Sequence, residues 1–452
     1  MNDSAHPRPT ARKVDAATLV VVGLLLMGCA IRFAVHEELT NNYGFFYYPP
    51  PISDMAIHLD LAKEVAAGRF PQPVMYTNPG YYHLLALVFK LGGDQEVMFI
   101  LQMLLGACIG PLLFSVLRRY GMRFSAAALT GMCFALYQPF VFYEQFLLLE
   151  PLHNICIAIL LATLTGLRTG WVQSMAASLL IGALHLLRPN IAVLWPVVLW
   201  WQHRRGASRM MLVAMVALWI PFFLFIPARN WVLGGTPVPG TLNFGDNVYI
   251  GNHSGSNGTF NVADGYQQLR KEADALPPAR QTGFWLRKTL DSWDSRAGWF
   301  RLLGRKLLLL WGAWELPNNI SLQAMESRSR SLAAPFLMRF GLLAPLGLVG
   351  IVLLALDRRS ELRRLGRLLA ASMAIFTVTI AAFVVLGRYR LPIATLLAIG
   401  AGQTLGGLAT DKERRWRIAA AVILLFYLIN GPMNLKDCLE IRLFGFPDWL
   451  RY

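Results

Sequence analysis

The stretch "FVVLGRYRLPIA", residues 383–394, places two arginines in a sequence that is otherwise apolar enough for the middle of a membrane. Arginine at bilayer depth is costly, and it usually faces a cavity or a partner group. Arg388 and Arg390 therefore raise two questions: which side of a membrane they face, and which negative group they meet. Both answers depend on how often the chain crosses the bilayer.

Apolar segments recur along all 452 residues. Hydrophobic residues make up 55% of the chain and charged residues only 15%, against about 25% charged residues in a typical soluble domain. The mean hydropathy is +0.45. This composition predicts an all-α polytopic membrane protein. The net charge of +16 is concentrated in short basic runs between apolar segments, which is typical of cytoplasmic loops and not of a nucleic-acid surface. The five cysteines show no metal or disulfide spacing.

Eleven membrane spans are expected. Arg8, Arg12 and Lys13 precede the first, which places the N-terminus in the cytoplasm. With eleven crossings, four basic runs all fall on the cytoplasmic side; they are residues 118–123, 203–209, 357–367 and 411–417. The expected spans are residues 17–34, 96–117, 124–143, 147–167, 172–187, 190–202, 209–227, 335–356, 367–386, 391–409 and 417–430.

Two further apolar stretches, 81–91 and 302–314, reach only about 15–20 Å as helices. We expect them to lie at the outer interface, because a crossing by either would invert the later basic runs. The transmembrane domain then covers 1–430, with outer loops at 35–95 and 228–334 and a short outer tail at 431–452. No P-loop or GxGxxG motif occurs. Chemistry is therefore expected on the outer face without ATP.

The first outer loop contains Asp54 and His58, one helical turn apart. Asp54 has two interpretations, the cap of a helix or a general base at the membrane surface. His58 is either a structural residue or part of the site.

Several other polar residues are expected at the outer ends of spans. Glu144 and Glu150 are either solvated at the interface or directed into a cavity. Arg188 accompanies Pro189, which breaks a helix, and Arg229 follows another span. Asn252 belongs to a Gly- and Asn-rich segment, residues 245–260, that is suited to sugar hydroxyls but also typical of an ordinary loop.

The span count places Arg388 and Arg390 on the outer face, against the usual charge bias. Two interpretations remain open and are compatible. The arginines bind a phosphate or diphosphate at headgroup level, because the guanidinium fork matches phosphate oxygens. Alternatively, they pair with Glu144, Glu150 or Asp54.

Seven motifs in one order resemble the bacterial GT-C glycosyltransferases of the family 39 type, which are related to protein O-mannosyltransferases and to the lipid A 4-amino-arabinose transferase. They extend from about residue 17 to 409. The motifs are "SDMAIHLDLAKEVAAGRF", "YEQFLLLEPL", "LLRPNIAVLWP", "ARNWVLGGTPV", "NVYIGNHSGSNGTF", "LWGAWELPNN" and "GRYRLPI".

The resemblance implies a GT-C bundle with outer-face interfacial helices, and transfer of a sugar from a polyprenyl-phosphate donor to a lipid, glycan or protein acceptor. It implies that Asp54 is the base, that Arg388 and Arg390, with Arg229, contact the donor phosphate, and that no cofactor is required. Two departures from the family pattern stand out. Met55 follows Asp54 where a second acid is frequent, which weakens a metal-dependent interpretation, and His253 replaces an asparagine.

A transporter or flippase of a lipid-linked sugar is the main alternative, and a scaffold without activity is a third. A transporter of this size usually contains internal repeats, and none is evident in the sequence. An enzyme in the inner membrane of a bacterium, acting by single displacement with inversion, is the expectation we carry forward. The sequence identifies neither the sugar nor the acceptor.

Overall fold

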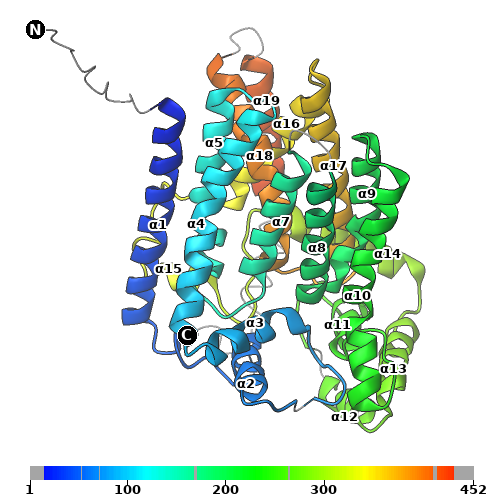
Figure 1. The fold of residues 1–452 in the computed structure, drawn as a ribbon. Coiled ribbons are helices and arrows are strands. Elements are labelled where there is room, and N and C mark those ends of the chain that lie inside the picture. Colours follow the sequence, from blue (N-terminus) through cyan, green and yellow to red (C-terminus); the bar gives the residue numbers. More distant parts are fainter. Residues whose placement is uncertain are drawn as a thin grey trace, which may run out of the picture.

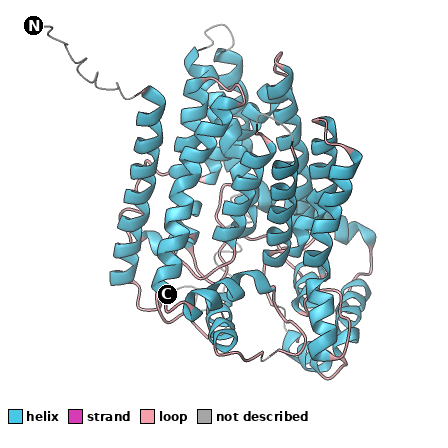
Figure 2. Cartoon of the chain, in the orientation of Figure 1, coloured by secondary structure: helices cyan, strands magenta, loops and turns pink. Residues whose placement is uncertain are grey.

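In the computed structural model, the described residues are 15–51, 53–70, 72–166, 170–262, 265–410 and 415–431. Helices make up 74% of the structure, and no β-strand occurs within these ranges (Figure 2). The predicted all-α fold class is therefore confirmed. The expected tail at 432–452 and the basic residues before position 15 lie outside the described ranges.

In the described part of the chain, five helices are long and apolar enough to cross a membrane, and four shorter apolar helices accompany them, so the chain is a multi-pass membrane protein. The five are α1 (Ala16–Asn42), α4 (Gln95–Arg119), α10 (Arg209–Gly234), α17 (Ser360–Ala381) and α18 (Leu391–Thr410) together with the 3-10 turn η2 (Gly387–Arg390). The four are α5 (Phe124–Ala135), α7 (Glu150–Leu164), α8 (Trp171–Leu187) and α16 (Phe340–Ala355).

Every expected span overlaps a helix, but several boundaries differ; α17, for example, covers Ser360–Ala381 instead of 367–386. Helices α1 and α10 continue to residues 42 and 234, so the loops begin at 43 and 235 instead of 35 and 228. Gly235, with a φ of 67°, ends α10 in the left-handed conformation that favours glycine. The span expected at 124–143 is interrupted after α5. A short helix, α6 (Gln138–Tyr143), begins there with a proline in its first turn.

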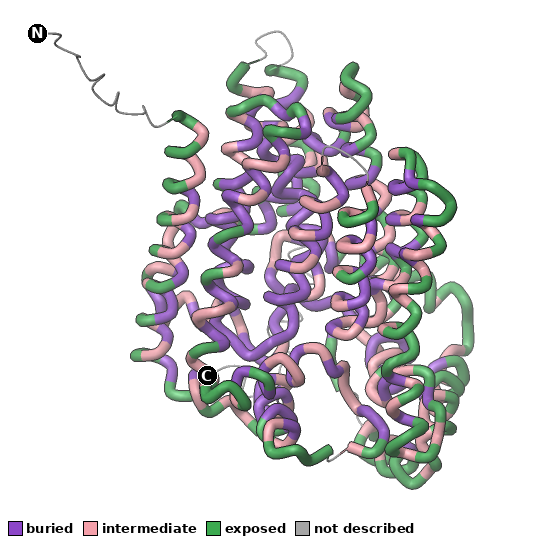
Figure 3. The backbone as a smooth tube through the Cα atoms, viewed as in Figure 1, coloured by how far each residue is buried: buried purple, intermediate pink, exposed green. Residues whose placement is uncertain are grey.

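Helix α18 lies at the centre of the bundle and packs against α5, α7, α16, α17 and α19 (Arg415–Asn430). Most of α18 is buried, whereas few residues of α1 and α10 are buried (Figure 3). Glycines bring α16 and α18 close together. A Cβ atom at Gly350 would lie 1.7 Å from the Gly400 carbonyl oxygen, a small-residue contact typical of membrane helices.

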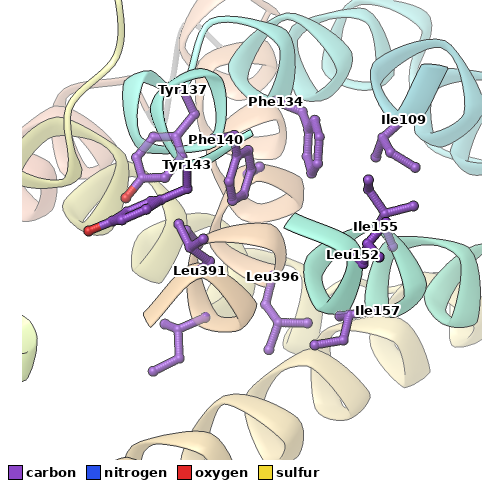
Figure 4. Close-up of a cluster of buried hydrophobic side chains, with 14 of the residues drawn as sticks. Ile109, Phe134, Tyr137, Phe140, Tyr143, Leu152, Ile155, Ile157, Leu391 and Leu396 are labelled. Carbon is purple, nitrogen blue, oxygen red and sulfur yellow. The ribbon is translucent and has the colours of Figure 1, made fainter. Parts of the chain in front are cut away.

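Buried aromatic side chains support the start of α18 (Figure 4). The rings of Phe134 and Phe140 are 4.4 Å apart, and those of Tyr137 and Phe140 are 4.7 Å apart. They come from the interrupted α5–α6 segment, and Phe140 is drawn beside Leu391. Because this packing fixes the start of α18, it also fixes the η2 turn that precedes it.

Most of the remaining helices belong to the two loops, and several gather at one end of the bundle (Figure 1). The predicted interfacial stretches coincide with α3 and α14. The loop helices are α2 (Asp54–Ala66), α3 (Pro79–Lys90), α11 (Asn243–Asn252), α12 (Tyr266–Asp274), α13 (Pro278–Asp291), α14 (Arg296–Trp311) and α15 (Leu322–Glu326). The 3-10 turn η1 (Pro189–Leu194) and α9 (Trp195–Arg204) complete the chain between α8 and α10.

The basic loops meet at the opposite end of the bundle. Arg359 Nη1 donates to the Gly121 carbonyl oxygen at 2.9 Å, and Arg123 Nη1 donates to Thr410 Oγ1 at 2.8 Å. The basic runs at 118–123 and 357–367 therefore share one face of the molecule, as the predicted topology requires.

Candidate active site

A cavity of about 840 Å³ lies where the two loops meet the helix ends. Five of the predicted site residues line it: Asp54, His58, Glu150, Arg188 and Arg388. They come from α2, from the start of α7, from the α8–η1 turn and from η2. The fold thus brings together residues that are up to 334 positions apart in the sequence.

Ser53, and not Asp54, caps helix α2. The Ser53 Oγ accepts a hydrogen bond from the Ala56 N–H at 3.2 Å. The Asp54 side chain is therefore free for other contacts. Its Oδ2 accepts hydrogen bonds from Arg388 Nη2 at 2.6 Å and from Asn319 Nδ2 at 2.8 Å. No described residue donates a hydrogen bond to the second oxygen, Oδ1.

Two acids and two arginines form one cluster, which we call the charge cluster: Asp54, Glu150, Arg188 and Arg388. Arg188 Nη2 donates to Glu150 Oε1 at 2.5 Å, and Arg388 Nη1 lies 3.4 Å from the same oxygen. Arg388 and Glu150 are buried, whereas the Asp54 side chain is 42% exposed. The formal charges of the cluster sum to zero.

Tyr389 lies between the two arginines of the charge cluster. The guanidinium carbon of Arg188 is 4.2 Å from the ring centroid, and that of Arg388 is 5.2 Å from it. A cation over an aromatic face is attracted by the ring quadrupole. The ring and Glu150 together therefore offset the repulsion between two like charges in a confined space.

The electrostatic environment of Asp54 favours the ionised form. Burial alone would raise its pKa. The positive charge of Arg388, a smaller effect of His58, and the hydrogen bonds from Arg388 and Asn319 outweigh burial and lower the pKa of Asp54 to about 2. The carboxylate is therefore charged at neutral pH but weakly basic while Arg388 holds it.

His58 is held in one tautomer. Its Nδ1 lies 3.0 Å from the Leu147 carbonyl oxygen, which can only accept, so the proton is on Nδ1. The ring packs 4.9 Å from Tyr81. Burial, which outweighs the neighbouring acids, lowers the pKa of His58. The imidazole is therefore neutral at pH 7, with Nε2 as an acceptor.

Arg390, although only two positions from Arg388, does not line the cavity. It is buried on the side of the η2 turn that faces away from the cavity. Its Nη2 donates to Glu315 Oε2 at 2.5 Å and to the Trp314 carbonyl oxygen at 2.6 Å, and its Nη1 donates to the Gly312 carbonyl oxygen at 2.6 Å. The predicted ion pair with an acid is present, but the acid is Glu315 and not one of the three expected partners.

Three other predicted site residues also lie outside the lining of the cavity. Glu144 is buried and pairs with Arg32 of α1. Arg229 donates from Nη1 to the Pro73 carbonyl oxygen at 2.8 Å. Asn252 accepts from Lys306 Nζ at 2.7 Å and donates to the Ala382 carbonyl oxygen at 3.0 Å. These contacts join helices and loops to one another.

The sequence analysis missed the asparagine pair Asn318–Asn319. Asn318 Oδ1 accepts from Arg388 Nη2 at 2.7 Å, and Asn319 Oδ1 accepts from the Asp54 backbone N–H at 3.1 Å. Among the described non-glycine residues, only Asn319 has a positive φ, of 60°. The sequence "PNN" is a turn signal and favours this conformation, but nothing in it indicates a partner in the first loop.

Within the described ranges, no group of three or more His, Cys, Asp or Glu residues is placed to hold a metal ion. Of the acids in the described part of the chain, Asp54 and Glu150 line the cavity, and each accepts from an arginine.

No protein-family model matches the chain, and no curated protein sequence matches it. Among solved structures, the archaeal oligosaccharyltransferase AglB from Archaeoglobus fulgidus, in complex with an inhibitory peptide and a dolichol-phosphate, is 14% identical with a TM-score of 0.47. That match covers 94% of this chain and 56% of AglB, so the chain spans little more than half of that enzyme's length.

Two further structures match. ArnT from Cupriavidus metallidurans, bound to undecaprenyl phosphate, is 15% identical with a TM-score of 0.36, and the match covers 94% of this chain and 88% of ArnT. The S. cerevisiae protein O-mannosyltransferase Pmt1-Pmt2 complex, bound to the sugar donor, is 17% identical with a TM-score of 0.34 over 50% of this chain and 34% of that one. These neighbours are GT-C glycosyltransferases, the type that the sequence motifs resemble, and at such identities and scores the likeness carries no inference about activity.

Proposed function

We propose that this protein is a membrane glycosyltransferase that moves a sugar from a polyprenyl-phosphate donor to an acceptor. One observation carries the proposal. A carboxylate suited to accept a proton, Asp54, and two arginines suited to bind phosphate, Arg188 and Arg388, meet at one cavity beside membrane helices. The motif resemblance supports the same conclusion.

The donor phosphate is assigned to the arginine side of the charge cluster. Arg388 is buried, and its Nε has no hydrogen-bond partner among the described residues. A phosphate oxygen supplies the missing acceptor in a charge-assisted bond. The cavity wall formed by Phe244, Ile380, Phe383 and Val384 is apolar and offers a surface for the start of a prenyl chain.

Asp54 is assigned as the general base. Its Oδ2 is held by Arg388 and Asn319, which leaves Oδ1 to accept a proton. A phosphate that draws the Arg388 guanidinium towards itself removes the main influence that lowers the pKa of Asp54, so the base becomes stronger when the donor is bound.

The reaction is a single displacement. The acceptor oxygen forms a bond to the anomeric carbon while the bond from that carbon to the phosphate oxygen breaks. Asp54 takes the proton from the acceptor, and the electron pair of the broken bond stays on the phosphate. Arg188 and Arg388 stabilise the charge that develops there. Such a step inverts the anomeric configuration and needs no cofactor.

The test is transfer by the purified protein from radiolabelled polyprenyl-phosphate sugar to a panel of lipid, glycan and protein acceptors. Asp54→Asn should lower transfer by at least about 100-fold while donor binding stays within a few-fold of wild type. Asp60→Asn is the matched control, because Asp60 is exposed on the same helix. Transfer by Asp54→Asn at the wild-type rate would overturn the assignment of the base.

Donor binding tests the phosphate site. Arg388→Gln should weaken the binding of polyprenyl phosphate about 10-fold or more, whereas Arg280→Gln, which alters an exposed arginine of α13, should not. Transfer that persists in EDTA would agree with the metal-free step. A wild-type protein that moves the lipid-linked sugar across vesicles without transferring it would support the transporter alternative.

A further inference from the structure

Four asparagine side chains line the cavity without making a hydrogen bond to any residue that the structure describes: Asn78, Asn190, Asn247 and Asn261. They come from the turn before α3, from η1, from α11 and from the segment after it. The Oδ1 atoms of Asn78 and Asn190 are buried and have no donor. Four unrelated segments thus converge with unused amide groups.

The chemistry of these groups indicates what they bind. A primary amide offers two N–H donors and one carbonyl acceptor. A buried acceptor without a donor is energetically unfavourable, so a ligand that brings donors to Asn78 and Asn190 is favoured. Sugar hydroxyls both donate and accept, and neighbouring hydroxyls on a ring match the spacing of an amide. Apolar ligands would leave all four amides unused.

The charged side chains that line the cavity, among the residues the structure describes, are already paired. Asp54 accepts from Arg388, and Glu150 accepts from Arg188 and lies 3.4 Å from Arg388. Asp246, the nearest acid in sequence to Asn247, is bonded to Arg270 at 2.5 Å and does not line the cavity. When the donor is bound as proposed, Arg188 and Arg388 face its phosphate and Asp54 faces the acceptor, so a carboxylate or an ammonium group on the sugar would lose hydration without gaining a free counter-charge.

We propose that the four amides form the sugar subsite of the donor and that this sugar carries no charge, for example a neutral hexose, pentose or N-acetylhexosamine. The proposal rests on the proposed function, because it takes the donor phosphate to lie at Arg188 and Arg388. Asn190 lies two residues after Arg188 in the Pro189 turn. The same turn therefore contributes a group to the phosphate and a group to the sugar attached to it.

The test compares the dissociation constants of undecaprenyl phosphate without a sugar and of the same lipid carrying a neutral hexose, pentose, N-acetylhexosamine, hexuronic acid or amino sugar. Full-length protein in nanodiscs is used. At least one neutral sugar should bind about 10-fold or more tightly than the bare lipid phosphate, and the two charged sugars should add nothing. Tighter binding of a hexuronic acid or amino sugar than of every neutral sugar would overturn the proposal.

Single substitutions test whether these asparagines provide the affinity that the sugar adds. Asn78→Ala and Asn190→Ala should each remove most of the gain that the neutral sugar provides, while the affinity for bare undecaprenyl phosphate stays unchanged. Asn42→Ala is the control, because Asn42 is exposed at the end of α1 and does not line the cavity. If both variants keep the full gain, the sugar lies elsewhere and the inference fails.

Different results would overturn the proposed phosphate site and the proposed sugar subsite. If wild-type protein does not bind bare undecaprenyl phosphate, or if Arg388→Gln binds it equally well, the proposed phosphate site is wrong. If the bare lipid phosphate binds in an Arg388-dependent manner but no sugar changes its affinity, the sugar subsite alone is wrong.

Discussion

At the scale of the residue, two arginines two positions apart have opposite surroundings. Arg388 faces the cavity and Asp54, whereas Arg390 is enclosed by backbone carbonyls and Glu315. The 3-10 turn η2 explains the difference, because three residues per turn place positions i and i+2 on different sides. The sequence indicates that both need an anionic partner, but it cannot choose the partners, which lie 75 and 334 positions away.

Arg390→Met should therefore act on stability. Removing the guanidinium leaves Glu315 buried without its counter-charge, and breaking such a pair costs about 3–5 kcal/mol. We expect a marked fall in the melting temperature of the purified protein, while any folded fraction binds undecaprenyl phosphate normally. Arg388→Met, measured alongside, should weaken lipid binding with a smaller loss of stability, because Glu150 keeps its pair with Arg188 and Asp54 is partly exposed. Normal stability with weakened lipid binding in Arg390→Met would place this arginine at the donor after all.

Asn319→Ala should change the pH profile of transfer. Asn319 donates to the ionised Asp54 and so contributes to its low pKa of about 2. Without that donor the pKa of Asp54 rises towards its ordinary value, and the carboxylate is protonated at higher pH. The acidic limb of kcat/KM should therefore move to higher pH than in wild type. Asn257→Ala, outside the lining of the cavity, should leave it in place. If the acidic limb of kcat/KM stays at its wild-type pH while the rate falls at every pH, Asn319 only supports the loop.

At the scale of the element, residues 72–78 of the first loop contact the second loop. Asp246 of α11 is the centre of this contact. Its Oδ2 accepts from Arg270 Nη1 at 2.5 Å, from Tyr76 OH at 3.1 Å and from Tyr266 OH at 3.4 Å. Thr77 and Asn78 of the same segment line the cavity. The packing of one loop on the other therefore sets the width of the site.

Asp246 should make this contact sensitive to pH. Burial, with one oxygen left without a partner, outweighs Arg270 and the tyrosines and raises the pKa of Asp246 to about 6. Because the pKa of Asp246 is higher in the folded protein than in the unfolded chain, protonation of this carboxyl stabilises the fold. This contribution is complete below the ordinary pKa near 4 and is lost as the pH rises through 6. Stability should therefore fall by on the order of 2 kcal/mol between pH 4 and pH 6 relative to Asp246→Asn, as measured by thermal melting at each pH. If the stability of wild type and that of Asp246→Asn change with pH in the same way, the prediction is wrong.

Helices were well predicted where apolar runs are long, and poorly where a helix breaks or where a loop ends. The interruption between α5 and α6 depends on a partner from another part of the chain. Gln138 N–H donates to the Met338 carbonyl oxygen at 3.0 Å, and Met338 N–H donates to the Leu136 carbonyl oxygen at 2.8 Å. Pro139 is a break signal within 124–143 that the expected continuous span did not use, but the pairing with Met338 cannot be read from that segment.

At the scale of the whole molecule, the two ends of the bundle differ in character. The basic loops meet at one end, and the cavity and several loop helices lie at the other (Figure 1). The all-α bundle could be predicted because periodic apolar length and charge placement are properties of the sequence itself. The site could be predicted only by residue type, because its geometry comes from contacts between distant segments.

The predicted orientation has a direct test. In a background without native cysteines, Ser254→Cys in the second loop and Ser360→Cys at the start of α17 provide exposed thiols at opposite ends. An impermeant maleimide added to intact spheroplasts should label Ser254→Cys, and should label Ser360→Cys only after lysis. The inverse pattern would place the N-terminus and the basic loops outside and would reverse the proposed topology.

The balance of the charge cluster has a consequence for energetics across the membrane. Two acids and two arginines that are displaced as a unit carry no net charge through the electric field, whereas a single charge moved across 100 mV changes the energy by about 2.3 kcal/mol. Displacement of this cluster as a unit is therefore insensitive to the voltage that the cell maintains. Voltage dependence at this cluster would enter with the charge of a bound ligand.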